Sequence, residues 1–286
     1  MDKILLLKID NLIQGNIIKR PSKLIKSPYV ADINKENNET ILGHCPSLGC
    51  CGLADNGTSI LMALSCPKKQ SKDREKLKCS YTVYLSIYEE KNEKIIIGIH
   101  PKLGEKLVHS AIKNNCLLLL KDVKELKTET KVFIENHVDS RFDFSGIDCN
   151  GKKFILEVKS VPLADYEDIT SKERKNKNYD DRLYNSKIAY FPDGYRKKKT
   201  DTISPRALKH IRELTYLKQT QGIRTIMCYI IQRNDVSSFQ PSFLDNTYRE
   251  AFFSAVNAGV EIITLVVSWN ESGEAYFVMD NLPINF

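Results

Sequence analysis

Short stretches of alternating apolar and polar residues dominate the first third of the chain. Residues 29–33 and 40–43 alternate around a polar turn, and residues 81–88 and 95–99 form a second candidate hairpin. The pattern gives no clear sign of a helix in this part of the chain, where apolar residues do not recur at helical spacing. It therefore predicts a small β-barrel or β-sandwich domain at residues 1–97.

Strands and helices alternate after that point. The pattern predicts helices at residues 104–114, 204–221 and 242–258, and strands at residues 117–120, 140–147, 153–161, 225–232, 261–268 and 275–279. Such alternation predicts an α/β (α+β) domain at residues 98–286, with a mixed sheet covered by helices. The densely charged residues 166–187 interrupt it, and we expect them to form an exposed, mobile insertion.

A predicted hairpin in this second domain carries the clearest chemistry. Asn-Gly at residues 150–151 is a strong turn signal between two strands. Side chains alternate between the two faces of a strand, so Glu157 and Lys159 are expected on the same face of the return strand. Asp143, on the preceding strand, is expected close to both of them across the hairpin.

Two carboxylates and a lysine in this arrangement suit metal-assisted hydrolysis of phosphodiesters. Asp143 and Glu157 would hold Mg²⁺ or Mn²⁺, with the carbonyl of Val158 as a third oxygen ligand. Lys159 would orient or deprotonate the attacking water, or stabilise charge in the transition state. A structural salt bridge between Lys159 and one of the carboxylates is the alternative, because an ionised carboxylate in an apolar strand needs a partner of some kind.

Composition favours a nucleic-acid partner and a location inside the cell. The 286 residues include 43 Lys and Arg against 36 Asp and Glu, and the resulting charge of +7 favours phosphate-bearing ligands. No uncharged apolar run is long enough to cross a bilayer, so we expect no membrane contact and a cytoplasmic protein, with a nuclear location left open. The eight cysteines include no C-x-x-C pair, which favours reduced thiols over disulfides or a zinc site.

Four segments, in order, strongly resemble the sugar fermentation stimulation protein (SfsA) family. They are residues 140–144 (SRFDF), 157–161 (EVKSV), 190–193 (YFPD) and 209–214 (KHIREL), and residues 43–46 (GHCP) resemble the start of a family motif nearer the N-terminus. The resemblance implies an N-terminal OB-like β-barrel followed by a PD-(D/E)xK nuclease-like mixed sheet flanked by helices. It also implies a DNA-binding protein linked to the regulation of sugar metabolism.

The resemblance further assigns residues to roles. It implies that Asp143, Glu157 and Lys159 form the catalytic triad of the nuclease type, and that Glu129 assists the metal. The chain departs from the family at Ser110, where a helix often carries a glutamate, and in the loop after residue 46, where Ser-Leu replaces Asn-Thr.

Basic side chains are the candidates for contacts with a phosphate backbone. We assign this role to Arg141, Arg196, Lys197, Lys209, Arg212, Arg20 and Lys23. His210 follows Lys209 directly, and we expect it to be a structural histidine in preference to a catalytic one. The motif at His44 and Cys45 is expected to be a structural loop, since no supporting acid for a Cys/His nucleophile is identifiable.

Three functions remain open from the sequence. The first is a divalent-metal-dependent DNA nuclease, and the alternative is a non-catalytic DNA-binding regulator of sugar metabolism that retains the nuclease fold. Retention of Asp143, Glu157 and Lys159 favours the first, because two carboxylates without a cation would repel phosphate. The third is a protein-interaction module that recruits a partner through the charged insertion. Strandedness of the nucleic acid is left open, as is a homodimer.

Overall fold

The structure is a computed structural model that describes residues 3–48, 52–65, 79–192 and 202–286. The helices are α1 (Leu103–Lys113), α2 (Ser171–Arg174), α3 (Pro205–Gln221) and α4 (Asn246–Asn257). The strands are β1 (Leu5–Lys8), β2 (Ile13–Lys19), β3 (Val30–Lys35), β4 (Thr40–His44), β5 (Ser59–Leu64), β6 (Tyr81–Glu90), β7 (Glu93–Gly98), β8 (Lys124–Ile134), β9 (Val138–Ile147), β10 (Lys153–Val161), β11 (Ala164–Asp165), β12 (Lys187–Phe191), β13 (Arg224–Ile231), β14 (Val236–Pro241), β15 (Glu261–Trp269) and β16 (Glu274–Met279).

The N-terminal part forms a closed barrel, as the alternating pattern predicted. Strands β2 to β6 are hydrogen-bonded in the order β4-β3-β2-β5-β6, and a parallel pairing of β4 with β6 closes the circle. Alternate residues of these strands point inward, and Ile17, Ile33, Ile60, Met62 and Val83 form the buried interior. Of the two predicted arrangements the barrel is the observed one. Its OB-like character remains an expectation from the family resemblance.

The first strand does not belong to this barrel. β1 pairs antiparallel with β16, placing Leu5 opposite Tyr276 at the other end of the chain. Leu6 is buried in the same hydrophobic cluster as Leu107 of α1. Residues 5–8 therefore complete the C-terminal sheet, although they lie within the predicted domain 1–97.

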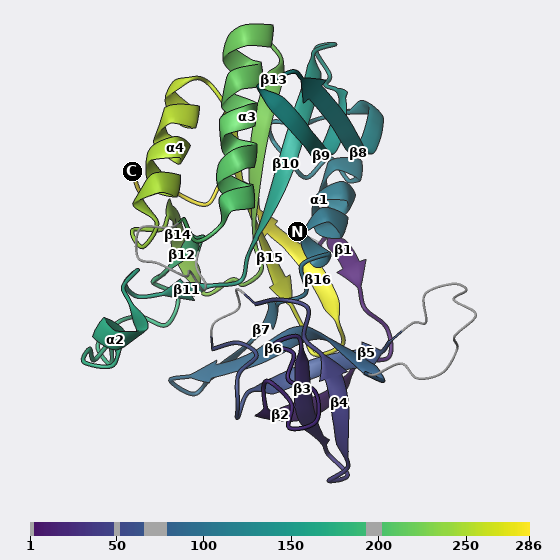
Figure 1. Ribbon diagram of the computed structural model, residues 1–286, viewed down its shortest axis with the longest axis vertical. Helices are drawn as coiled ribbons and strands as arrows, with labels where there is room; N and C mark the ends of the chain where they lie inside the picture. Colours follow the sequence, from purple (N-terminus) through teal and green to yellow (C-terminus); the bar gives the residue numbers. More distant parts are fainter. Residues whose placement is uncertain (1–2, 49–51, 66–78, 193–201) are drawn as a thin grey trace.

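Helices cover both faces of the C-terminal sheet (Figure 1). β10, β13 and β15 run parallel at its centre, and β9 pairs antiparallel with β10. One cluster of buried apolar side chains joins the sheet to α1, and a second joins it to α3 and α4. Because β13 is buried on both faces, its sequence is a continuous apolar run with no alternation. The chain is thus a mixed α+β protein, as predicted.

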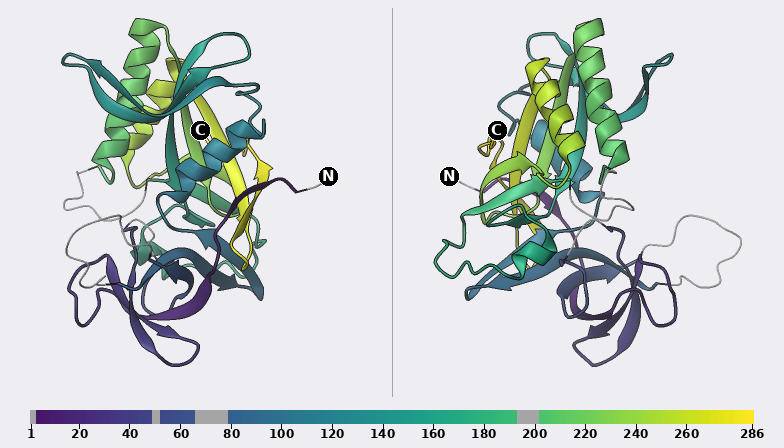
Figure 2. Two further views of the ribbon diagram at one scale, coloured as in Figure 1. Left: turned by 90° about the vertical axis from the view of Figure 1, so that its right-hand side faces the viewer. Right: turned by 60° about the vertical axis from the view of Figure 1, so that its left-hand side comes forward.

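The structure differs from the sequence prediction in two segments. Residues 117–120 form a turn after α1, with the N–H of Leu120 donating to the carbonyl of Leu117, and are not a strand. Their apolar side chains had suggested a buried strand. β8 was missed because most of its residues are polar and exposed; it forms a hairpin with β9 that projects from the sheet (Figure 2).

The charged segment 166–187 is anchored to the rest of the molecule. Tyr166, Tyr179 and Lys187 are buried. The ammonium group of Lys187 lies 3.0 Å from a carboxylate oxygen of Glu90 and 2.9 Å from one of Asp235. The prediction of an exposed insertion is therefore wrong at these three positions, because the buried side chains pack the segment against β6 and the residue before β14.

Candidate metal centre

Asp143 lies where β9 separates from β10. The two strands pair in register up to Phe144 opposite Leu156, and from there β9 continues with β8 as its partner. The N–H of Val158, which the departing strand leaves without a ladder partner on that side, donates to Oδ2 of Asp143 at 2.7 Å. This hydrogen bond fixes the carboxylate beside the next residues of β10.

Glu157 follows on β10 and is buried, with 2% of its surface exposed. Its Oε1 accepts hydrogen bonds from the ammonium group of Lys159 and from the ring of His210. Its Oε2 is also buried, yet it has no hydrogen-bond partner among the described residues. A buried carboxylate oxygen without a partner is costly, and a cation bound to this oxygen would offset that cost.

His210 reaches Glu157 from α3. Ser204 caps this helix by accepting a hydrogen bond from the N–H of Ala207, and Pro205 fits its first turn. The His210 ring is 4% exposed and lies 5.9 Å, centre to centre, from the ring of Phe142. Two distant segments thus meet at one carboxylate.

The hydrogen bonds define which ring nitrogen of His210 carries a proton. Nδ1 faces Glu157 Oε1 and lies 3.3 Å from the ammonium nitrogen of Lys159. A carboxylate only accepts, so the contact with Glu157 requires a proton on Nδ1, and Nδ1 then cannot accept a hydrogen bond from the ammonium group of Lys159. Both contacts of Oε1 are therefore made by donors, and they hold the carboxylate in one orientation.

The two carboxylates differ in their electrostatic surroundings. Burial, together with the negative charge of Glu157, raises the pKa of Asp143 to about 7. Burial also acts to raise the pKa of Glu157, but the hydrogen bond from His210 and the charge of Lys159 outweigh it, so this pKa lies below its usual value. Glu157 is therefore the ionised partner, and Asp143 lacks enough positive charge nearby to be fully ionised at neutral pH.

The oxygens of these two groups fit a hard divalent cation. Asp143 and Glu157 each retain an oxygen that accepts no hydrogen bond from the described residues, and such cations prefer carboxylate oxygens. Within the described ranges, no group of three or more His, Cys, Asp or Glu side chains surrounds a single point. Among the described residues, the side chains of Asp143 and Glu157 would hold the cation.

Sequence reasoning missed Glu105 in the first turn of α1. Its negative charge lies close enough to Asp143 to raise the pKa of that group further. It occupies the same helix as Ser110, where the family resemblance had indicated a departure. The only sign of this role in the sequence was an acidic residue in the first turn of the predicted helix.

Glu129 and Arg141 lie apart from the acidic pair. Both are exposed on the β8–β9 hairpin, where Arg141 Nη1 lies 3.4 Å from Glu129 Oε2. Glu129 is not among the charges that act most strongly on Asp143. The structure thus brings Asp143, Glu157 and Lys159 together as predicted and leaves Glu129 on the surface.

The predicted phosphate-binding residues other than Arg141 and Arg20 fall into three groups. Lys209 and Arg212 are exposed on α3, beside a hollow of about 440 Å³, and the ammonium group of Lys209 also donates to the carbonyl of Asp139 at 2.6 Å. Lys23 is exposed near the barrel. Arg196 and Lys197 lie outside the described residues.

Arg20 has a structural role that the sequence did not indicate. Its guanidinium group donates to the backbone carbonyls of Pro28, Cys45, Ser47 and Ala54. These bonds tie the loop after β4 to the segment before β3. With so many donors engaged, Arg20 is not free to bind a phosphate, and we leave it out of the proposed nucleic-acid surface.

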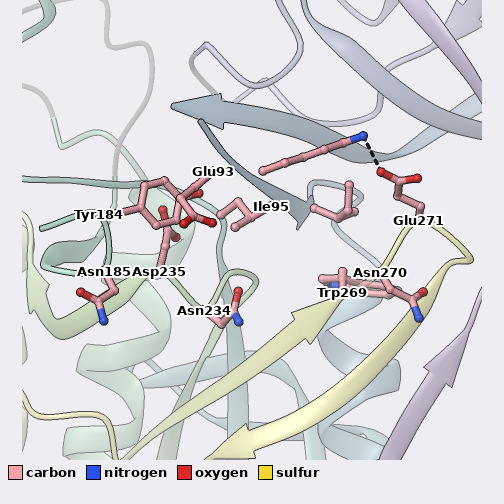
Figure 3. Close-up of a pocket in the computed structure, with 11 residues that line it drawn as sticks. Glu93, Ile95, Tyr184, Asn185, Asn234, Asp235, Trp269, Asn270 and Glu271 are labelled. Carbon is pink, nitrogen blue, oxygen red and sulfur yellow. Dashed lines mark ion pairs between the residues drawn. The ribbon is translucent and has the colours of Figure 1, made fainter. Parts of the chain in front are cut away.

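A hollow of about 490 Å³ lies between β7, the charged segment and the β15–β16 turn (Figure 3). Its acidic side chains are largely paired: Glu271 binds Lys94, and Asp235 binds Lys187 and Arg233. None of the hairpin carboxylates lines it. This hollow is therefore separate from the candidate metal centre.

The mixed sheet, its covering helices and the acidic hairpin define an α+β protein with a candidate metal centre. The family model described as "Sugar fermentation stimulation protein RE domain" matches residues 102–172 and 173–273. A sugar fermentation stimulation protein homolog of Trichodesmium erythraeum is 30% identical over 258 residues, covering 90% of this chain and 85% of that protein. One of Clostridium tetani is 30% identical over 255 residues, covering 88% of each. The chain belongs to the sugar fermentation stimulation protein (SfsA) family.

A solved structure supports the same fold. The structure described as that of Pyrococcus furiosus SfsA in complex with Ca²⁺ matches with a TM-score of 0.72 at 20% identity. The match covers 99% of this chain and 100% of that chain, so the likeness includes both the barrel and the helix-covered sheet. None of the helices in the described part of this chain has the length and apolar character needed to cross a lipid bilayer.

Proposed function

We propose that this protein is a divalent-metal-dependent nuclease acting on DNA. The observation that carries the proposal is the buried Glu157 Oε2 without a partner, beside an Asp143 whose pKa is about 7. An acidic pair of this kind is costly in the metal-free protein and becomes favourable when a shared cation neutralises it. A protein that only binds DNA gains nothing from such a pair, because carboxylates repel phosphate.

Asp143 and Glu157 would hold Mg²⁺ or Mn²⁺, which polarises a phosphate and lowers the pKa of a bound water. The N–H of Val158 and the ring of His210 keep the two carboxylates oriented. His210 is thus a positioning residue. Lys159, whose ammonium group binds Glu157, would donate to the attacking water or to a phosphate oxygen. The Pyrococcus furiosus relative, described in complex with Ca²⁺, supports a site for a hard cation in this fold.

The second candidate function is a DNA-binding regulator without turnover. It is favoured by the ion pair between Lys159 and Glu157, which occupies the lysine that hydrolysis would use. The small number of side-chain ligands around the acidic pair favours it too, in the described part of the chain. In this case the protein would bind DNA and leave it intact.

Incubation with supercoiled plasmid and with a labelled single-stranded oligonucleotide separates the two. We expect cleavage with Mg²⁺ or Mn²⁺, none in EDTA, and none from Asp143→Asn or Glu157→Gln. Asp139→Asn, which removes an exposed charge from the same strand, should cleave like the wild type. Cleavage that persists in EDTA or in Asp143→Asn would contradict the proposed mechanism. Salt-sensitive binding without cleavage in any metal would favour the regulator.

A further inference from the structure

Two flat rings are stacked at the edge of the barrel, next to α1. Tyr84 lies on β6, and His100 follows the end of β7. Their ring centres are 4.7 Å apart and the ring planes differ by 13°. The backbone N–H groups of Ile99 and His100 both donate to the carbonyl of Tyr84, at 2.9 and 3.2 Å. The backbone therefore holds the two rings together as a fixed pair.

His100 is a neutral ring with positive groups around it. Burial, together with the nearby charges of His44, Lys102 and Lys106, lowers its pKa to about 4. Its Nδ1 accepts a hydrogen bond from the backbone N–H of Lys102 at 3.2 Å. The proton of the neutral ring is therefore on Nε2, which remains a hydrogen-bond donor.

The first turn of α1 connects this ring pair to the acidic centre. α1 begins at Leu103, three residues after His100, and lies between the barrel and the β8–β9 hairpin (Figure 1). Lys102 and Lys106 are exposed and act on His100, whereas Glu105, between them, acts on Asp143. One helical turn thus carries two ammonium groups near the ring pair and a carboxylate near Asp143.

We propose that Tyr84 and His100, with Lys102 and Lys106, bind an unpaired nucleotide of a single-stranded nucleic acid whose scissile phosphate lies at the acidic pair. Flat side chains beside cations suit single strands, whose bases have free faces for stacking, and the lysines suit the phosphates. A duplex hides its base faces and would use the lysines alone. The inference rests on the proposed function, because it takes the ligand to be nucleic acid, and it adds the strandedness of the substrate.

Binding to a labelled oligothymidylate and to a labelled hairpin duplex of equal length, measured by fluorescence anisotropy in EDTA, tests the proposal. His100→Leu removes the flat ring at similar volume, and His100→Phe retains a flat ring. We expect His100→Leu to weaken single-strand binding about tenfold, as the loss of one stacked base would do, and to leave duplex binding unchanged. His100→Phe should restore most of the lost affinity.

Replacing both Lys102 and Lys106 with Ala should weaken binding of both ligands, and more so at low salt. Lys113→Ala, in the last turn of the same helix, is the matched control and should have no such effect. Melting temperatures close to the wild type show that the variants fold. Wild-type single-strand affinity in His100→Leu, or an equal loss for single strands and duplex, would overturn the proposal.

The same variants separate this inference from the proposed nuclease function. If His100→Leu loses single-strand binding selectively while no metal supports cleavage, the binding site stands and the nuclease proposal fails. If Asp143→Asn abolishes cleavage while His100→Leu binds and cleaves single strands normally, the nuclease proposal stands and the binding site is refuted.

Discussion

Removal of the Asp143 charge should make the metal-free protein more stable. In Asp143→Asn the amide oxygen can still accept the hydrogen bond from the N–H of Val158, while the charge beside Glu157 is lost. The pKa of Asp143 rises from 3.8 to about 7 on folding, which corresponds to roughly 4 kcal/mol of unfavourable free energy once the group is ionised. Because the side chain is partly exposed, solvent screening lowers our expectation to about 2–4 kcal/mol.

Because folding raises the pKa of Asp143, the stability difference between Asp143→Asn and the wild type depends on pH. Between pH 4 and 7 the folded protein retains the proton on Asp143 while the unfolded chain has lost it, so the wild type loses stability as the pH rises through this range. Above pH 7 the loss is complete and constant. The variant carries no such group, so its advantage over the wild type should be small near pH 4 and full at pH 8.

Urea unfolding in EDTA at pH 5, 6.5 and 8 measures this difference, and adding Mn²⁺ at pH 8 reverses it. A cation that binds only the folded protein should stabilise the wild type in proportion to the logarithm of its concentration and should have little effect on Asp143→Asn. Asp139→Asn, exposed on the same strand, should match the wild type both in EDTA and in its response to Mn²⁺. Equal stability of Asp143→Asn and wild type at pH 8 in EDTA, or equal stabilisation by Mn²⁺, would refute the reasoning.

Three further substitutions test neighbouring parts of the structure. His210→Gln should weaken Mn²⁺ binding about 10- to 100-fold in calorimetry, because it loosens Glu157; unchanged affinity would show that Lys159 suffices. Glu129→Gln should bind Mn²⁺ as the wild type does, since the side chain is exposed and distant from the pair, and a clear loss would place Glu129 among the ligands. Lys187→Met should lower the free energy of unfolding by about 3 kcal/mol in urea titrations, because it leaves the buried Asp235 and the partly buried Glu90 without this partner, and an unchanged value would contradict that role.

The sequence contained enough information to find the acidic hairpin. Alternation along two strands and the Asn-Gly turn bring Asp143 near Glu157 and Lys159, and the structure confirms that neighbourhood. These contacts are local, between residues at most 16 positions apart. Pattern reasoning works well at this range because a two-residue period fixes which side chains share a face.

The sequence could not reveal which residues from distant segments contact the acidic pair. His210 meets Glu157 across 53 positions, and Glu105 comes from α1, so their roles depend on how helices pack against the sheet. The same limit explains why Arg20 was predicted to bind phosphate, although its guanidinium group donates to backbone carbonyls. It also explains Lys187, which the surrounding run of charges suggested to be exposed, although it is buried in an ion-pair cluster.

The two carboxylates differ in pKa, and this difference predicts which of them releases a proton when a cation binds. Glu157 is already ionised and held by two donors, so it needs no proton exchange, whereas Asp143 must ionise in order to bind. With a pKa of about 7 for Asp143, Mn²⁺ binding should release close to one proton at pH 6 and almost none at pH 8.5. Titration calorimetry in buffers with different ionisation enthalpies counts these protons directly. Release of the same number at both pH values would mean that Asp143 is not the group that the cation deprotonates, and the two-carboxylate site would have to be abandoned.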